Sequence, residues 1–228
     1  RKKALEDFLD REIELESVFS REGNTGKLAA VKPYDAEFFF VRQREMKGTG
    51  HALLSARPFV GTGPVVVAYP DDIHMGEPPL ALQLVRAWEK TGCSVLATIH
   101  DPPEINRYGI LDLAADNLHV KDMAEKPAPG TEPSREVSIG RYLYTPDFFD
   151  YLEEGWRKHL AGPNPEGEYY HLYALKKLME QNKVVYKRTE GLRLDTGEPE
   201  GYLRAFIAYA AGIPELRRVL VESIKGLS

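Results

Sequence analysis

Aspartates stand in two segments that are far apart in the sequence, at 71–72 and at 195. Asp71 and Asp72 follow, after Pro70, the apolar run Val65–Tyr69, whose length and continuous hydrophobicity predict a strand covered on both faces. Ligands bind at the carboxyl ends of strands in open α/β sheets, and a carboxylate there suits Mg²⁺, which prefers oxygen ligands. Asp195, in the segment Leu194–Glu198, offers a second carboxylate that could converge with Asp71 on one cation. Turn formation or helix capping is the commoner role of such aspartates, so the residues alone leave both interpretations open.

A glycine-containing segment and a Glu-Lys pair are the other candidates for ligand binding. The segment Lys47–His51 (KGTGH) leads into a helical pattern, and its glycines allow close backbone approach near a helix N-terminus, which attracts negative charge. It lacks the Gly-Lys-Ser/Thr ending of a Walker motif. Glu125 could accept hydrogen bonds from sugar hydroxyls, and Lys126 could neutralise a phosphate. A solvated Glu-Lys pair is the commoner explanation by composition alone.

The elements that position these residues alternate between strands and helices in the first half of the chain. A short aromatic and β-branched run at 37–41 predicts a strand, with Gln43 at its C-terminal end. Buried strands are predicted at 65–69 and 94–99, and an amphipathic helix over Pro79–Lys90 connects them. This order predicts right-handed crossovers and helices on both faces of a sheet.

The second half of the chain adds an antiparallel region. Alternating residues at 108–113 and 118–123, separated by turn residues, predict a β-hairpin. Strands at 138–144 and 184–187, with helices between them, and two C-terminal helices complete the pattern. We therefore predict an α/β fold. It is a Rossmann-like three-layer sandwich with a mostly parallel mixed sheet, a small antiparallel β-hairpin region and C-terminal helices.

The bulk composition excludes several classes of partner. A net charge of −5 and a pI near 5.8 give no broad basic field, so we expect neither nucleic acid nor a membrane as a partner. No apolar run approaches the roughly 20 residues of a membrane span. The single cysteine, Cys93, lies in an apolar run and allows no internal disulfide, which fits a reducing compartment and a cytoplasmic protein.

In their order and spacing, the motifs resemble those of bacterial UTP–glucose-1-phosphate uridylyltransferases along nearly the whole chain. The stretches that carry the resemblance are Ala4–Glu16, Val41–Phe59, Val67–Ile73, Leu84–Val95, Tyr108–Gly109, Val120–Pro127, Gly140–Tyr142 and Gly191–Leu203. The resemblance implies that the phosphate of glucose 1-phosphate attacks the α-phosphorus of UTP, giving UDP-glucose and pyrophosphate. UTP, glucose 1-phosphate and UDP-glucose are then the expected ligands, Mg²⁺ the expected cofactor, and a homo-oligomer (dimer or tetramer) the expected assembly.

At the nucleotide and metal end, the resemblance implies four residues. Gln43 and the backbone of Gly48 would bind the uracil edge. Asp71 and Asp195 would hold the Mg²⁺ that bridges the phosphates.

At the sugar end, the resemblance implies three more residues. Gly109 would let the sugar approach the main chain, Glu125 would bind its hydroxyls, and Lys126 would contact its phosphate. Asp71, Lys126 and Asp195 are therefore the expected catalytic residues.

Two features depart from the family pattern. The family's first strand and its glycine-rich loop, with an arginine and a nearby lysine for the triphosphate, belong upstream of Arg1. We therefore interpret residues 1–228 as a single nucleotidyltransferase domain that lacks these parts, and we expect this chain alone to have little activity. In addition, the family's Gly-Glu-Ile-Gln-Leu-Thr-Asp-Ala is replaced by Gly167–Ala174 (GEYYHLYA), which differs at five of the eight positions and puts the sugar side in question.

Three activities besides uridylyl transfer are compatible with parts of the pattern. A thymidylyl- or cytidylyltransferase acting on another sugar 1-phosphate would share the fold, although Gln43 and Lys47–His51 favour uridine. A metal-dependent glycosyltransferase also places acidic residues after a parallel strand, but it gives no reason for Glu125–Pro127 followed by Asp195. The third is ligand binding without turnover, in a non-catalytic paralogue.

Overall fold

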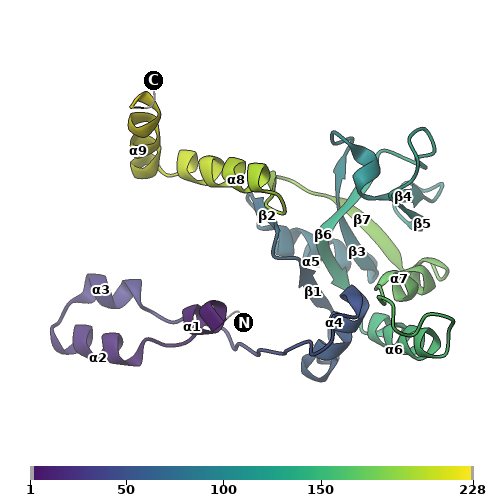
Figure 1. Cartoon of the computed structure of the whole chain (residues 1–228), viewed down its shortest axis with the longest axis horizontal. Helices are drawn as coiled ribbons and strands as arrows, with labels where there is room; N and C mark the ends of the chain where they lie inside the picture. The colour runs from purple at the N-terminus through teal and green to yellow at the C-terminus, as the bar shows by residue number, and fades with distance from the viewer. Residues whose placement is uncertain (1–2, 227–228) are drawn as a thin grey trace. The chain divides into compact units, whose positions relative to one another are not determined.

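The computed structural model describes residues 3–226 and contains two compact units, Arg1–Glu45 and Met46–Ser228 (Figure 1). In the part of the chain that is described, no helix combines the length and the apolar character needed to cross a membrane. Each unit is considered by itself below.

The first unit is helical. Helices α1 (Lys3–Leu9), α2 (Ile13–Arg21) and α3 (Thr25–Ala30) precede a segment without regular secondary structure. The strand predicted at 37–41 is wrong, because no strand lies in residues 3–45. Aromatic residues favour a strand only where a neighbouring strand completes the backbone hydrogen bonds, and the three phenylalanines at 38–40 are instead 40–64% exposed.

The second unit contains a six-stranded mixed sheet. Its strands are ordered β5-β4-β6-β3-β7, with β1 pairing with β6 outside this path. The bounds are β1 (Val65–Ala68), β3 (Ser94–His100), β4 (Gly109–Leu113), β5 (Val120–Glu125), β6 (Glu136–Tyr144) and β7 (Val184–Arg188). The predicted hairpin is β4 and β5, and it forms one edge of this sheet.

The prediction of a mostly parallel sheet requires correction, because only β3 and β7 pair in parallel among the described strands. Strand β6 lies between β3 and β4 and runs antiparallel to both, and β1 also pairs antiparallel with it. Strands β1, β3, β4 and β7 therefore run in one direction, as the predicted crossovers require. A continuous apolar run carries no information on the direction of a strand. The prediction that the strand at 65–69 is covered on both faces is also wrong, because burial alternates along β1 and Val66 is 38% exposed.

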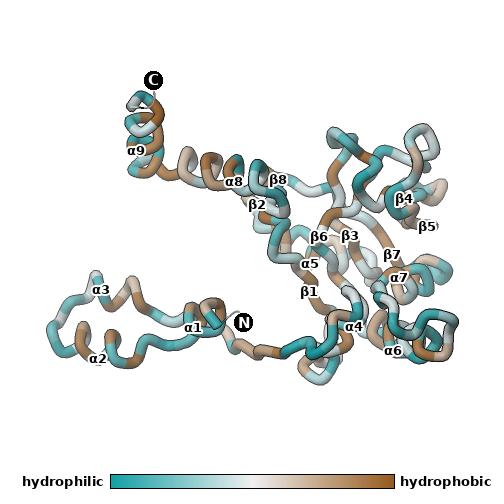
Figure 2. Tube along the Cα trace, in the orientation of Figure 1, coloured by the Kyte–Doolittle hydropathy of each residue, from teal (hydrophilic) through white to brown (hydrophobic). Residues whose placement is uncertain are grey.

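Helices cover both faces of the sheet, which confirms the predicted three-layer α/β architecture. Helix α5 (Leu80–Thr91) packs Leu80 and Leu84 on one face, against Val95 of β3 and Leu143 of β6. Helices α6 (Asp147–Leu160) and α7 (Leu172–Met179) cover the other face, where the core includes Leu96, the residue after Val95. Successive strand residues point to opposite faces, so β3 supplies a residue to each core. Figure 2 shows hydrophobic colour along β1 and β7.

The remaining elements surround this sandwich. Helix α4 (Gly48–Ala56) and the short 3₁₀ turns η1 (Arg57–Phe59) and η2 (Ile105–Arg107) precede or connect strands. A separate antiparallel sheet pairs β2 (Asp72–Met75) with β8 (Leu192–Asp195). The two predicted C-terminal helices are confirmed as α8 (Pro199–Gly212) and α9 (Pro214–Lys225).

Candidate active site

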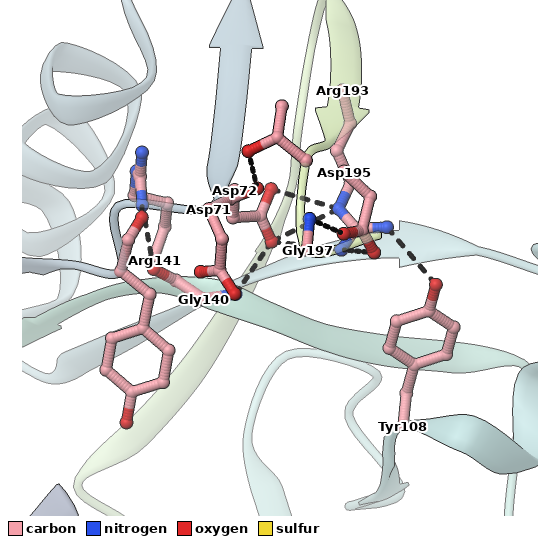
Figure 3. Close-up of polar contacts among 10 residues, drawn as sticks. Asp71, Asp72, Tyr108, Gly140, Arg141, Arg193, Asp195 and Gly197 are labelled. Atoms are coloured by element: carbon pink, nitrogen blue, oxygen red, sulfur yellow. Dashed lines mark hydrogen bonds and ion pairs between the residues drawn. The ribbon is translucent and has the colours of Figure 1, made fainter. Parts of the chain in front are cut away.

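The two aspartates expected to hold a metal lie side by side because β2 and β8 pair. The pairing sets Asp72, the first residue of β2, opposite Asp195, the last residue of β8. The backbone N–H and the hydroxyl of Thr196 donate to the carbonyl oxygen of Asp71 at 2.8 and 2.9 Å. Residues 124 positions apart, Asp71 and Asp195, are thus held at one end of the small sheet (Figure 3).

The side chains of Asp71 and Asp195 approach a common point at Gly197. A methyl group placed on Gly197 would lie 3.3 Å from Asp195 Oδ1 and 3.6 Å from Asp71 Oδ2. The Gly197 N–H also donates to Asp195 Oδ1 at 3.1 Å. Both aspartates are exposed, so a ligand can reach them.

This carboxylate pair fits Mg²⁺ that takes the rest of its ligands from elsewhere. Protein-bound Mg²⁺ usually has one or two carboxylate ligands, and waters and substrate phosphates complete its octahedral shell. In residues 3–226 no group of three or more His, Cys, Asp or Glu side chains is arranged to hold a metal. Asp71 and Asp195 therefore suit a cation that completes its shell with waters or with the oxygens of a phosphate substrate.

Asp72 and Arg193 form a buried ion pair beside these aspartates. Arg193 Nε donates to Asp72 Oδ1 at 3.0 Å and Nη2 donates to Oδ2 at 3.0 Å, while Nη2 lies 3.2 Å from Asp195 Oδ2. The side chains of Arg193 and Asp72 are only 15% and 7% exposed. Burial by itself would lower the pKa of Arg193, but the hydrogen bonds that its guanidinium donates to Asp72 and Tyr108 outweigh this effect, so the pKa is raised and the guanidinium stays charged.

The sequence did not single out Arg193 or a separate role for Asp72, although two signals existed. Asp71 and Asp72 are adjacent, and neighbouring side chains in an extended segment point in opposite directions, so only one of them can face the metal. Arg193 stands two residues before Asp195 and therefore shares its face of the strand.

The three residues expected at the sugar end also lie together. Gly109 pairs with Glu125 across the β4–β5 hairpin, and a methyl group on Gly109 would lie 3.1 Å from Glu125 Oε2. The Lys126 N–H donates to the carbonyl oxygen of Tyr108 at 3.0 Å. Lys126 has a φ of 45°, in the left-handed region that non-glycine residues rarely adopt and that is found repeatedly at ligand sites.

These residues line a cavity of about 540 Å³. Small-molecule sites usually have volumes of about 300–1,000 Å³ and combine apolar walls with a few polar groups. The polar or charged groups in its wall include Thr49, Tyr69, Glu125, Lys126, His171 and Arg193. The cavity thus connects the sugar-end residues to Arg193, and through it to the aspartates.

The two residues expected at the nucleotide end have different surroundings. Gly48 has a φ of 85°, and a methyl group there would lie 2.6 Å from the carbonyl oxygen of Tyr169. The backbone of Tyr169 in turn bonds to Lys47 and Gly50, at 2.7 and 2.9 Å. Packing against Tyr169 is therefore one reason for the glycine at position 48. Gln43 belongs to the first unit, and its role stays a prediction.

His171 is a cavity residue that was not assigned to the site from the sequence. Its Nδ1 lies 3.1 Å from Thr49 Oγ1 and 3.3 Å from the Tyr69 hydroxyl. Its Nε2 is buried and has no hydrogen-bond partner among the described residues. Burial lowers the pKa of His171 to about 4, so the imidazole is neutral at pH 7. The departure of Gly167–Ala174 from the family pattern was the available signal.

Comparison with known proteins gives the family. The protein family described as "Nucleotidyl transferase" matches residues 11–212, which is most of the chain. The chain belongs to the nucleotidyl transferase family. The resemblance to UTP–glucose-1-phosphate uridylyltransferases is likewise confirmed. The chain is 39% identical to UTP–glucose-1-phosphate uridylyltransferase 2 of Staphylococcus saprophyticus, over 99% of its own length and 78% of that protein.

Solved structures of nucleotidyl transferases agree with this assignment. The chain is similar to a UDP-glucose pyrophosphorylase complexed with UDP-glucose, at 30% identity and a TM-score of 0.72, covering 93% of this chain and 78% of that one. It is also similar to a UTP-bound UGPase from Acinetobacter baumannii, at 25% identity and a TM-score of 0.82, covering 100% and 80%. Both similarities extend over nearly the whole of this chain, so the fold of this nucleotidyl transferase is that of UDP-glucose pyrophosphorylases.

Proposed function

We propose that this protein makes UDP-glucose and pyrophosphate from UTP and glucose 1-phosphate. One observation carries the proposal. The sugar-end residues Gly109, Glu125 and Lys126 line the same cavity as Arg193. Arg193 is paired with Asp195, whose carboxylate lies beside that of Asp71. The relatives that bear the names UTP–glucose-1-phosphate uridylyltransferase and UDP-glucose pyrophosphorylase supply the identity of the substrates.

The reaction requires positioning more than a covalent group from the protein. A phosphate oxygen of glucose 1-phosphate bonds to the α-phosphorus of UTP. The bond from that phosphorus to the bridging oxygen breaks, and pyrophosphate leaves with the electron pair. Two reactants held in line gain most of their rate from orientation and from neutralisation of charge.

At the sugar end, each residue has a distinct role in this proposal. The Glu125 carboxylate accepts hydrogen bonds from sugar hydroxyls, and Gly109, which lines the cavity, lets the sugar approach the main chain. The Lys126 ammonium neutralises the attacking phosphate as a compact point charge. Its rare backbone conformation turns the chain directly after Glu125.

At the other end, Asp71 and Asp195 would hold Mg²⁺ with a phosphate substrate. When bound, Mg²⁺ would neutralise the negative charge of the phosphates. Gln43 and the backbone of Gly48 are proposed to bind the uracil edge, which rests on the resemblance. A homo-oligomeric state and a cytoplasmic location also remain proposals.

The experiment that tests the function is a panel of nucleoside triphosphates. The purified full-length protein is given glucose 1-phosphate and Mg²⁺ with UTP, dTTP, CTP, ATP or GTP, and pyrophosphate release is measured. We expect UTP to give the highest kcat/KM and UDP-glucose to be the second product. Equal rates with dTTP would overturn the assignment of the base.

Two further measurements distinguish uridylyl transfer from glycosyl transfer and from ligand binding without catalysis. Release of UDP from UDP-glucose in the presence of an acceptor sugar would indicate a glycosyltransferase. Saturable binding of UDP-glucose in calorimetry without turnover would indicate a non-catalytic paralogue.

A further inference from the structure

The pairing of β2 with β8 creates an electrostatic problem at the site. Asp72 and Asp195 stand directly opposite each other on antiparallel strands, where like charges destabilise the pair. Asp72 is also buried, and a buried carboxylate requires a charged or hydrogen-bonding partner. A group with several donors in a fixed geometry is needed to satisfy both carboxylates.

Arg193 is that group. Its Nε and Nη2 bind the two oxygens of Asp72 at 3.0 Å each, and Nη2 also lies 3.2 Å from Asp195 Oδ2. The Gly140 N–H adds a bond of 3.1 Å to Asp72 Oδ2, which ties the buried carboxylate to β6 of the main sheet. The contacts of Asp195 with Arg193 and Gly197 fix the orientation of its carboxylate beside Asp71.

The guanidinium also reaches the sugar end of the cavity. Arg193 Nη1 donates to the Tyr108 hydroxyl at 3.4 Å, and the guanidinium lies 5.3 Å from the centre of the Tyr108 ring. Tyr108 precedes Gly109, and its carbonyl oxygen accepts the Lys126 N–H. One side chain therefore contacts the residues around both halves of the site (Figure 3).

We propose that Arg193 is a positioning residue that holds Asp195 in place for the divalent cation and Tyr108 in place for the sugar phosphate. The inference rests on the proposed function for the identity of the sugar phosphate. The part that concerns the cation depends only on the carboxylates. A lysine at this position keeps the charge but cannot bind Asp72, Asp195 and Tyr108 together, because its ammonium is a single point on a flexible stem.

The test measures Mn²⁺ binding to the protein alone, by electron paramagnetic resonance titration, together with steady-state kinetics. In Arg193→Lys we expect the Kd for Mn²⁺ to rise about 10-fold or more, as is typical when a residue that orients a metal ligand is lost. We expect the KM for glucose 1-phosphate to rise as well. Tyr108→Phe keeps the ring beneath the guanidinium but loses the hydroxyl, so it should raise that KM and leave Mn²⁺ binding unchanged.

Two further variants separate positioning from folding. Arg188→Lys is the matched control, since Arg188 pairs with the buried Glu136 away from the cavity, and it should change neither constant. The double variant Asp72→Asn with Arg193→Met removes both buried charges, and it should keep a native circular dichroism spectrum while binding Mn²⁺ as weakly as Arg193→Lys.

Defined outcomes would overturn the inference. Unchanged Mn²⁺ affinity in Arg193→Lys, or no Mn²⁺ binding by the wild type, would show that Arg193 does not position a cation ligand. Wild-type protein that binds Mn²⁺ in an Arg193-dependent way but forms no UDP-glucose would instead overturn the proposed function and leave the cation part of the inference standing.

Discussion

The adjacent aspartates at the start of β2, Asp71 and Asp72, have opposite surroundings. Asp71 is exposed and approaches Asp195, whereas Asp72 is buried against Arg193. An exposed carboxylate can exchange water for a cation at small cost, but a buried, paired carboxylate would first have to break its ion pair. Of the two, Asp71 is therefore the candidate metal ligand and Asp72 the structural one.

Replacing Asp71 by Asn tests this division. The amide has nearly the same size but no charge, so in the full-length protein we expect Mg²⁺-dependent turnover to fall by about 100-fold or more, in the range seen when one electrostatic contact to the transition state is lost. The thermal unfolding midpoint should change little, since the side chain is exposed. Asp112→Asn, in strand β4 and paired with Lys121 of β5, is the control and should retain wild-type turnover. Near-normal turnover in Asp71→Asn would remove the residue from the metal role.

Glu125 gives a second prediction at this scale. Glu125→Gln weakens hydrogen bonds accepted from sugar hydroxyls, and bonds to a charged group contribute about 1.5–3 kcal/mol. We expect the KM for glucose 1-phosphate to rise about 10-fold or more while the KM for UTP changes much less. Glu104→Gln, an exposed carboxylate paired with Arg107, should leave both constants unchanged. Equal increases in the two KM values would contradict a sugar-specific role.

Among the elements, local sequence signals predicted the bounds of a helix and the β4–β5 hairpin, whereas the pairing of strands far apart in the sequence was not predicted. Helix α5 begins after Pro79 and ends at Gly92, which adopts the left-handed conformation as a C-cap, so both of its boundaries are encoded locally. Strands β2 and β8 are four residues each, and their partners lie more than a hundred positions apart, so no local pattern announces them. The antiparallel placement of β6 has the same cause, because strand direction depends on non-local contacts.

The site residues that could be predicted from the sequence are likewise those with a local signal. The candidate aspartates and the Glu125–Lys126 pair could be named from residue type and from the family resemblance. For Arg193 and His171 the sequence carried only indirect signals, because their importance comes from neighbours supplied by other segments: Asp72 in one case, and Thr49 with Tyr69 in the other.

Gly48 at the start of α4 gives a prediction for an element. A φ of 85° and a neighbouring carbonyl 2.6 Å from the added methyl make alanine unfavourable here on two counts. We expect Gly48→Ala to lower the free energy of unfolding in urea by roughly 1–3 kcal/mol. Gly61→Ala is the matched control, since a methyl group at that position has no neighbour within 4 Å, and it should be close to neutral. Equal stability of the two variants would show that the backbone around Gly48 and Tyr169 can move apart to accept a methyl group at no cost.

In the second unit, residues of the cavity wall also contact the hydrophobic core. His171 contacts Thr49 and Tyr69 through hydrogen bonds, and its ring lies 5.4 Å from that of Tyr142, which belongs to the core of one sheet face. Burial also raises the pKa of Tyr69, so its hydroxyl stays protonated and can donate to the neutral imidazole. Protonation of His171 would therefore disturb both the cavity and the core.

This arrangement makes the stability of the molecule depend on pH. The pKa of His171 is about 4 in the folded protein and about 6.5 in an unfolded chain. Because the folded value is the lower one, the unfolded chain binds a proton first as the pH falls. The stabilisation is complete above pH 6.5 and is lost progressively toward pH 4. Between pH 7 and pH 5 this group should lower the free energy of unfolding by about 2 kcal/mol.

Urea denaturation at pH 7 and pH 5 measures this contribution by comparing variants. Other groups titrate in the same range, so the informative quantity is the difference between the wild type and His171→Leu, which lacks the titrating ring. The variant should lose about 2 kcal/mol less than the wild type on acidification. Leu84→Ala removes a fully buried side chain but no titratable group, so it should be less stable at both pH values while keeping the wild-type pH dependence. An unchanged pH dependence in His171→Leu would mean that the imidazole is protonated equally in the folded and unfolded states, and hence that solvent reaches it in the folded cavity.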